Sequence, residues 1–194
     1  GKHVIPDPED NIPQIPEISD LKSEVIKLIP IGANRDTKII AEDLQEGKIN
    51  YLIGDEPEGW KTNIPTYGAV VYKEIYKNID MKFYGNNRQM EYDIIVKPGA
   101  DPSVVRLSYE DIEGLSVTEE GNLEIVMKEG CVIQKRPYIY QEIDGKRIEI
   151  EGDFNILETA KSIIPDQEPQ SNNPEFAYGF QVASYNKSHP LIID

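Results

Sequence analysis

The chain lacks the residues on which the commonest catalytic and metal centres are built. Its one cysteine, Cys131, excludes an intramolecular disulfide and any zinc cluster made of cysteines. Its two histidines, His3 and His189, stand at opposite ends of the sequence and assemble no imidazole-based triad. The sequence also has no GxSxG or HExxH motif, no phosphate-binding glycine-rich loop and no EF-hand pattern. We therefore assign no catalytic residue and expect that the protein is not an enzyme.

Positive charge is scarce as well. Thirty-five acidic residues stand against twenty basic ones, which gives a formal net charge of −15. Such a surface repels phosphate backbones and anionic lipid headgroups, so we expect no nucleic-acid partner. Solubility explains the acidity, and the alternative is a site for a divalent cation such as Ca²⁺, which needs clustered oxygen ligands. No other cofactor is expected.

Long apolar runs are absent too. No run approaches the ~18 residues that a membrane helix needs, and no signal-peptide pattern opens the sequence. We expect no membrane insertion. A trimmed export product would share these features with a cytosolic protein, so they leave the compartment open.

What the chain does contain is a succession of short apolar segments separated by turn-forming residues. Fourteen glycines and fourteen prolines divide the sequence at short intervals, which favours many short strands over long helices. This pattern predicts an all-β fold, an antiparallel β-sandwich built from consecutive hairpins. The expected strands are Val25–Ile31, Ile49–Ile53, Ala69–Tyr76, Ile79–Tyr84, Gln89–Val96, Val104–Tyr109, Leu115–Thr118, Leu123–Lys128, Cys131–Lys135, Tyr138–Ile143, Arg147–Leu157 and Phe176–Tyr185.

Three segments stand apart from the strands. Residues 1–20 contain four prolines and are predicted to form an extended tether. The polar stretch 158–175 is predicted to form a long surface loop. Only Asp36–Gly47 suits a short helix, with Asp36 as its N-cap, so we expect at most one helix. Residues 21–194 then form a single β-sandwich domain, and a division into two β subdomains stays open.

The stretch "YKNIDMKFYGNNRQMEYDIIVKPGADP" predicts a hairpin around a turn at Asn86–Asn87. This register collects apolar residues on one face and places Asp80 opposite Asp93 on the other. Like charges that face each other are destabilising, so the two carboxylates either share a proton or a Ca²⁺ ion, or point apart toward water or a neighbouring basic side chain. Asp80 and Asp93 are therefore the candidate metal ligands.

Two further turns are predicted on the same grounds. A three-residue loop at Glu120–Asn122 would align Val117 with Ile125. The dipeptide Asp144-Gly145 is the favoured two-residue hairpin turn and would set Glu142 opposite Arg147.

Aromatic residues gather between positions 60 and 84. Planar rings stack on sugars, which makes Trp60, Tyr67 and Tyr84 candidate ligand-binding residues, whereas core packing is the other use of such rings in a β fold. Glu91 and Asp93 share one strand face, as a pair of carboxylates for glycan hydrolysis would.

The order of several motifs resembles a known bacterial domain. These are "NYLIGDEPEGWKTNIPTYGAVVYKEIYKNIDMKFYG", "MEYDIIVKPGADPSVVRLSYEDIEGLSV", "GNLEIVM", "RPYIYQEIDGKR" and "YNKSHPLIID". Together they resemble the N-terminal domain that precedes SBBP (β-propeller-type) repeats in large exported bacterial proteins, over most of residues 25–194. The resemblance implies an extracytoplasmic, secreted or cell-surface β domain of adhesion type. It brings no catalytic residues.

Three functions remain in competition. The first is a non-catalytic structural or adhesion-type module of a bacterial surface protein. The second is a carbohydrate- or calcium-binding module, and the third is a glycan hydrolase. The expected partner is a polysaccharide or another surface protein.

Overall fold

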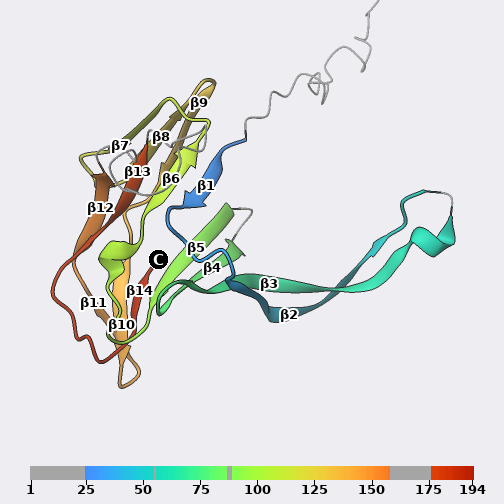
Figure 1. The fold of residues 1–194 in the computed structure, drawn as a ribbon, viewed down its shortest axis with the longest axis horizontal. Coiled ribbons are helices and arrows are strands. Elements are labelled where there is room, and N and C mark those ends of the chain that lie inside the picture. Colours follow the sequence, from blue (N-terminus) through green and yellow to red (C-terminus); the bar gives the residue numbers. More distant parts are fainter. Residues whose placement is uncertain (1–24, 55, 87–88, 158–175) are drawn as a thin grey trace, which may run out of the picture.

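A computed structural model describes residues 25–54, 56–86, 89–157 and 176–194. Within these ranges the chain is all-β, with three antiparallel sheets, which confirms the predicted fold class (Figure 1). These ranges contain no α-helix, and only two 3₁₀ turns occur, η3 (Pro57–Gly59) and η4 (Pro102–Val104). Over the same residues, no helix has the length and hydropathy needed to span a bilayer. The predicted tether and the predicted loop at 158–175 lie outside the described residues.

The strands are arranged in sheets of seven, four and three. The large sheet has the order β11-β10-β14-β5-β4-β3-β2, the second has the order β1-β6-β13-β12, and the small one has the order β7-β8-β9. The strands are β1 (Lys27–Pro30), β2 (Lys38–Tyr51), β3 (Lys61–Tyr76), β4 (Ile79–Asn86), β5 (Gln89–Val96), β6 (Leu107–Glu110), β7 (Gly114–Val117), β8 (Leu123–Met127), β9 (Gly130–Gln134), β10 (Ile139–Ile143), β11 (Lys146–Glu149), β12 (Gly152–Leu157), β13 (Ala177–Val182) and β14 (Leu191–Ile193).

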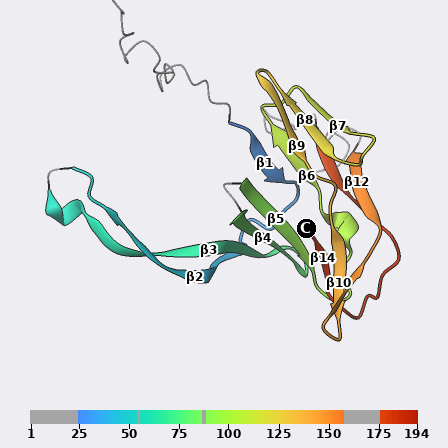
Figure 2. The ribbon, with the colours of Figure 1, turned by 180° about the vertical axis from the view of Figure 1, so that it is seen from behind.

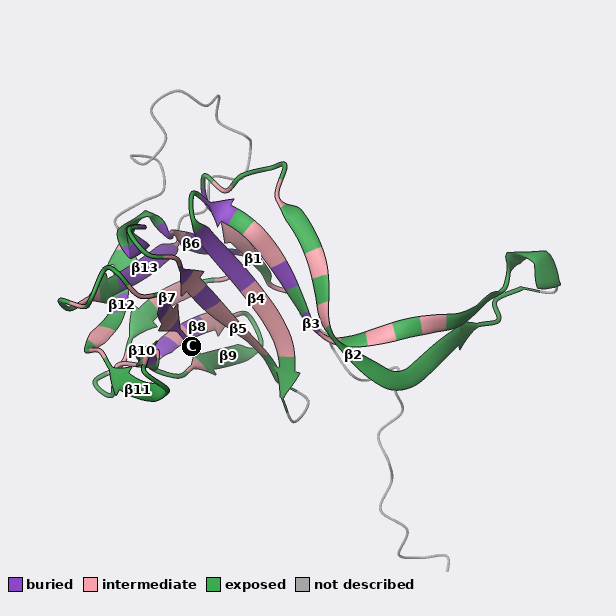
Figure 3. Ribbon diagram, turned by 90° about the horizontal axis from the view of Figure 1, so that it is seen from below, coloured by how far each residue is buried: buried purple, intermediate pink, exposed green. Residues whose placement is uncertain are grey.

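One hydrophobic core joins the three sheets. The large sheet contributes Met81 and Ile94, the four-stranded sheet contributes Leu107 and Tyr178, and the small sheet contributes Ile125, all of them buried. Figure 3 shows the buried residues within the body of the molecule, while the far parts of β2 and β3 are exposed or half-buried. Alternation along each strand produces this arrangement, because successive side chains point to opposite faces of a sheet.

Most predicted strands are present, and β5 occupies the predicted range Gln89–Val96. The suggested helix at Asp36–Gly47 is wrong, because Lys38–Tyr51 forms one long strand that pairs with β3. Intrinsic helix preference is weak, and tertiary pairing overrides it here. The predicted strand Arg147–Leu157 is two strands, β11 and β12. Strand β14 was not predicted.

The predicted register of the β4–β5 hairpin is wrong by two residues. In the structure Lys82 lies opposite Asp93 and Asp80 lies opposite Ile95. A shift of two keeps every side chain on its face, so the alternation of apolar residues is satisfied by both registers. The predicted register pairs Lys82 with Glu91, and the observed one pairs it with Asp93, so both contain one attractive pair. The observed register differs in removing the Asp80–Asp93 repulsion.

The two other predicted turns had different outcomes. The Asp144-Gly145 turn is confirmed, because Glu142 pairs with Arg147 and both turn residues have positive φ, 52° and 71°. The β7–β8 register is again displaced by two, since Leu115, and not Val117, lies opposite Ile125. A longer turn closes this hairpin, in which the N–H of Thr118 donates to the carbonyl of Asn122.

Candidate functional site

The most unusual feature of the molecule is a two-stranded hairpin that leaves the body (Figures 1 and 2). Strand β3 pairs with β4 only from Ala69 onward, so residues 43–68, here called the arm, have no third described strand beside them. None of the fourteen residues of β2 is buried. Seven large apolar side chains of the arm are exposed, namely Leu44, Ile49, Tyr51, Leu52, Ile53, Trp60 and Tyr67.

The arm has regular local pairing although it lacks a core. Leu44 faces Tyr67 and Ile49 faces Ile64, and such apolar cross-strand pairs stabilise a two-stranded ribbon. Register shifts between Leu44 and Lys48 make it bend. At its inner end the carboxylate of Asp43 occupies the space that a Cβ on residue 68 would need, so a larger residue at that position would require the Asp43 side chain to move. These features hold the arm in one shape but bury little apolar surface.

The tip of the arm carries a hollow and a fixed ring. Tyr51, Ile53, Gly59, Lys61 and Ile64 line a hollow of about 400 Å³. Next to it, the indole N–H of Trp60 donates to the carbonyl of Gly54 at 3.0 Å. This bond orients the ring while leaving it 39% exposed. The tip is therefore shaped to receive an apolar group.

The three predicted ligand-binding rings do not form one platform. Trp60 lies at the tip of the arm, and Tyr67 lies seven residues further along the chain, roughly 20 Å away along an extended strand. Tyr84 is on β4, where its hydroxyl donates to Asp93 at 2.8 Å. Burial and the Asp93 carboxylate both raise the pKa of the Tyr84 phenol. Of these three rings, Trp60 and Tyr67 are exposed.

The Asp80 side chain is buried and forms ion pairs with two lysines. Its side chain accepts from the backbone N–H of Glu74 at 2.8 Å and contacts the ammonium groups of Lys97 at 3.0 Å and Lys73 at 3.2 Å. Burial by itself raises the pKa of Asp80, but these three donors outweigh it and hold the pKa below its ordinary value. Both of its oxygens already have cationic or N–H partners.

Asp93 lies in a different setting. Burial is the main cause that raises the pKa of this carboxyl, and Asp194 and Glu91 raise it further, while the hydroxyl of Tyr84 and Lys82 lower it. Asp80 and Asp93 are thus not opposite each other and do not share partners. Over the described residues, no three His, Cys, Asp or Glu side chains are grouped to hold a metal ion.

Removing the Tyr84 hydroxyl is expected to raise the pKa of Asp93. The Tyr84→Phe variant loses the hydrogen bond that favours the charged carboxylate, while the burial that favours the neutral acid remains. NMR titration of the Asp93 carboxyl carbon measures the shift. Tyr72→Phe, which removes a hydroxyl from a neighbouring strand, serves as the control, and an unchanged Asp93 pKa in Tyr84→Phe would contradict the assignment.

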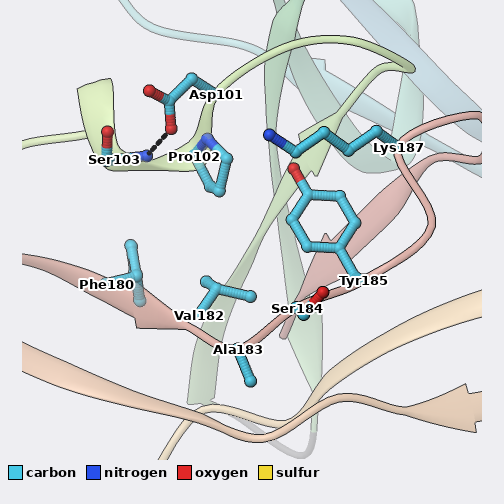
Figure 4. A pocket seen from close by; sticks show the side chains of 9 residues that line it. All are labelled: Asp101, Pro102, Ser103, Phe180, Val182, Ala183, Ser184, Tyr185 and Lys187. Carbon is cyan, nitrogen blue, oxygen red and sulfur yellow. Dashed lines mark hydrogen bonds between the residues drawn. The ribbon is translucent and has the colours of Figure 1, made fainter.

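A second hollow, of about 330 Å³, lies between η4 and the chain that follows β13 (Figure 4). The polar side chains that line it are those of Asp101, Ser103, Ser184, Tyr185 and Lys187. The N–H and hydroxyl of Ser103, and then Lys187, lower the pKa of Asp101. The ring of Tyr185 is held by a hydrogen bond from its hydroxyl to the carbonyl of Ala100. No sequence signal pointed to this hollow, because its two walls are about eighty residues apart in the chain.

Fold and surface together define an all-β module with one hydrophobic core and a projecting apolar arm. The chain belongs to a family described as a domain of unknown function, DUF7948, whose model matches residues 3–194. No curated protein and no solved structure matches the chain.

Proposed function

We propose that the chain is a non-catalytic structural or adhesion-type module of an extracytoplasmic protein, which attaches to another protein through the arm. The observation that carries this proposal is the arm itself, a two-stranded hairpin with seven exposed large apolar side chains and no third described strand beside it. Monomeric proteins seldom expose contiguous apolar patches beyond a few hundred Å², and larger ones mark interaction sites.

The placement outside the cytoplasm is supported by the resemblance to the domain that precedes SBBP repeats. A rigid body with a shared core suits a module that must hold its arm in a constant position. The ion pair of Asp80 with Lys73 and Lys97 anchors β3, the strand by which the arm returns to the body.

A thermal-shift screen tests the non-catalytic proposal. Ca²⁺, Mg²⁺ and a panel of cell-wall and host polysaccharides are each added in excess, and the melting temperature is expected to stay constant. A ligand at ~100 times its dissociation constant would add about 2.7 kcal/mol, which is a shift of several degrees. A saturable shift with any of them would overturn the proposal in favour of a binding module.

The second candidate is carbohydrate binding, favoured by the exposed and oriented indole of Trp60. If a polysaccharide does shift the melting temperature, Trp60→Ala should abolish that shift. Tyr138→Ala, which removes a similarly exposed ring from the body, is the matched control. A glycan hydrolase based on Glu91 and Asp93 is the third candidate, and Glu91→Gln would abolish its activity.

A further inference from the structure

We propose that the arm of one molecule docks on the outer edge of β9 of a second copy of the same chain, in a reciprocal dimer. This inference rests on the proposed function, because it names the protein that the arm binds. It follows from three properties of the described surface: the apolar area of the arm, its charge, and a second unpartnered edge elsewhere on the molecule.

The area of the arm fits a protein interface. Its seven exposed apolar side chains present roughly 800 Å², with about 200 Å² for a fully exposed large side chain. Specific complexes bury about 800 Å² on each partner. A two-stranded hairpin alone is only marginally stable in water, so docking would also stabilise the arm.

The charge of the arm indicates what kind of surface it meets. Residues 43–68 contain five acidic side chains, Asp43, Glu46, Asp55, Glu56 and Glu58, against the two basic side chains Lys48 and Lys61. A complementary partner is apolar with basic flanks, since opposite potentials across an interface favour docking and select the partner.

Strand β9 offers such a surface within this chain. It is the edge of the small sheet, with no described strand on its outer side. Val132 and Ile133 are exposed on it, 41% and 47% respectively. Lys128 and Lys135 flank it, against the single acidic residue Glu129, while Arg136 further along pairs with Asp153 at 2.7 Å, so this segment is weakly basic in a chain of net charge −15.

The arm and β9 of one molecule do not meet. In Figures 1 and 2 the arm leaves the body beside β4, and its tip lies far from β9. Two copies related by a two-fold axis bring each arm to the other copy's β9, so both contacts form at once. Edge strands with open N–H and C=O groups accept a further strand, which supplies main-chain hydrogen bonds in addition to apolar contact.

Sedimentation equilibrium tests the dimer. The wild-type chain is expected to be a dimer at micromolar concentration, within the range for interfaces of this size. Ile53→Asp should raise the dissociation constant roughly 30-fold by placing a charge where an isoleucine would be buried. Met90→Asp is the matched control, because Met90 is 80% exposed and Ile53 is 77% exposed, but Met90 lies on β5 outside the arm. It should leave the constant unchanged.

Crosslinking tests where the arm docks. Cys131 is the chain's single cysteine and is exposed on β9. Wild-type chain is mixed with Thr62→Cys/Cys131→Ser, which carries its only thiol on the arm, and treated with a short bis-maleimide. A heterodimeric product is expected, and Lys146→Cys/Cys131→Ser, with an exposed thiol on β11, should give little of it.

The outcomes separate this inference from the proposed function. A monomeric wild-type chain, a dimer insensitive to Ile53→Asp, or equal crosslinking by the two thiol variants would each overturn docking on β9. None of these results changes the thermal-shift panel. A saturable shift with a polysaccharide would overturn the proposed function whatever the oligomeric state.

Discussion

Replacing Tyr178 by alanine is expected to lower the free energy of unfolding by about 4 kcal/mol, in the range for a large buried aromatic side chain. Tyr178 is fully buried on β13. Its ring stacks on Tyr109 at 5.8 Å between centroids and meets Phe154 and Phe180 edge-on. Truncation therefore leaves a cavity where the four-stranded sheet packs on the rest of the core. Urea denaturation followed by fluorescence measures the loss.

The hydroxyl of Tyr178 accounts for a smaller part of this loss in unfolding free energy. It exchanges a hydrogen bond with the hydroxyl of Tyr92 at 2.9 Å, and Gln134 donates to the same Tyr92 oxygen at 2.7 Å. Tyr178→Phe keeps the ring and removes one of these bonds, so it should cost about 1 kcal/mol. If Tyr178→Ala lowered the free energy of unfolding no more than Tyr178→Phe does, the packing of the Tyr178 ring would not be what stabilises this part of the core.

Asp80→Asn is expected to destabilise the protein by about 2 kcal/mol at neutral pH, since hydrogen bonds to charged groups contribute 1.5–3 kcal/mol. The carboxylate is 3% exposed and holds Lys73, Lys97 and the N–H of Glu74. The variant leaves two ammonium groups without their anion. Both are partly exposed and can turn toward water, which keeps the cost below that of a fully buried pair.

The pH dependence gives this prediction its second readout. Because the folded-state pKa of Asp80 is lowered, its contribution is complete above the ordinary pKa of a free aspartate and is lost as the pH falls through the folded-state value. Wild-type stability should therefore decline on acidification more steeply than that of Asp80→Asn. Urea denaturation across the acidic range measures both slopes.

Asp93→Asn is the control on the same sheet. The pKa of Asp93 is raised, so this residue favours the folded state more as the pH falls, the opposite sign from Asp80. Its replacement should leave neutral-pH stability unchanged or slightly higher. If the free energy of unfolding fell equally steeply with pH in wild type and in Asp80→Asn, the stabilising role of the Asp80 ion pair would be contradicted.

Local features of this protein were predictable where one short segment contains all the necessary information. The Asp144-Gly145 turn defines its own hairpin, because those two residues accept positive φ and leave only one register. Strand β5 was predicted at its observed bounds from alternation and flanking turns. Of the site, the sequence indicated that Trp60 and Tyr67 were candidates, and both are exposed.

What the sequence by itself determined is thus the all-β class, most strands and their faces, since these depend on a period of two along the chain. Only the tertiary structure decided the β4–β5 register, because a shift of two preserves that period, and the observed register avoids placing Asp80 opposite Asp93. It also decided that β2 and β3 extend beyond the sheet as an arm, which depends on where β4 ends, at Asn86. Finally, it decided that η4 lies against the end of β13. The contact between η4 and the end of β13 joins residues far apart in the chain, and no local pattern encodes it.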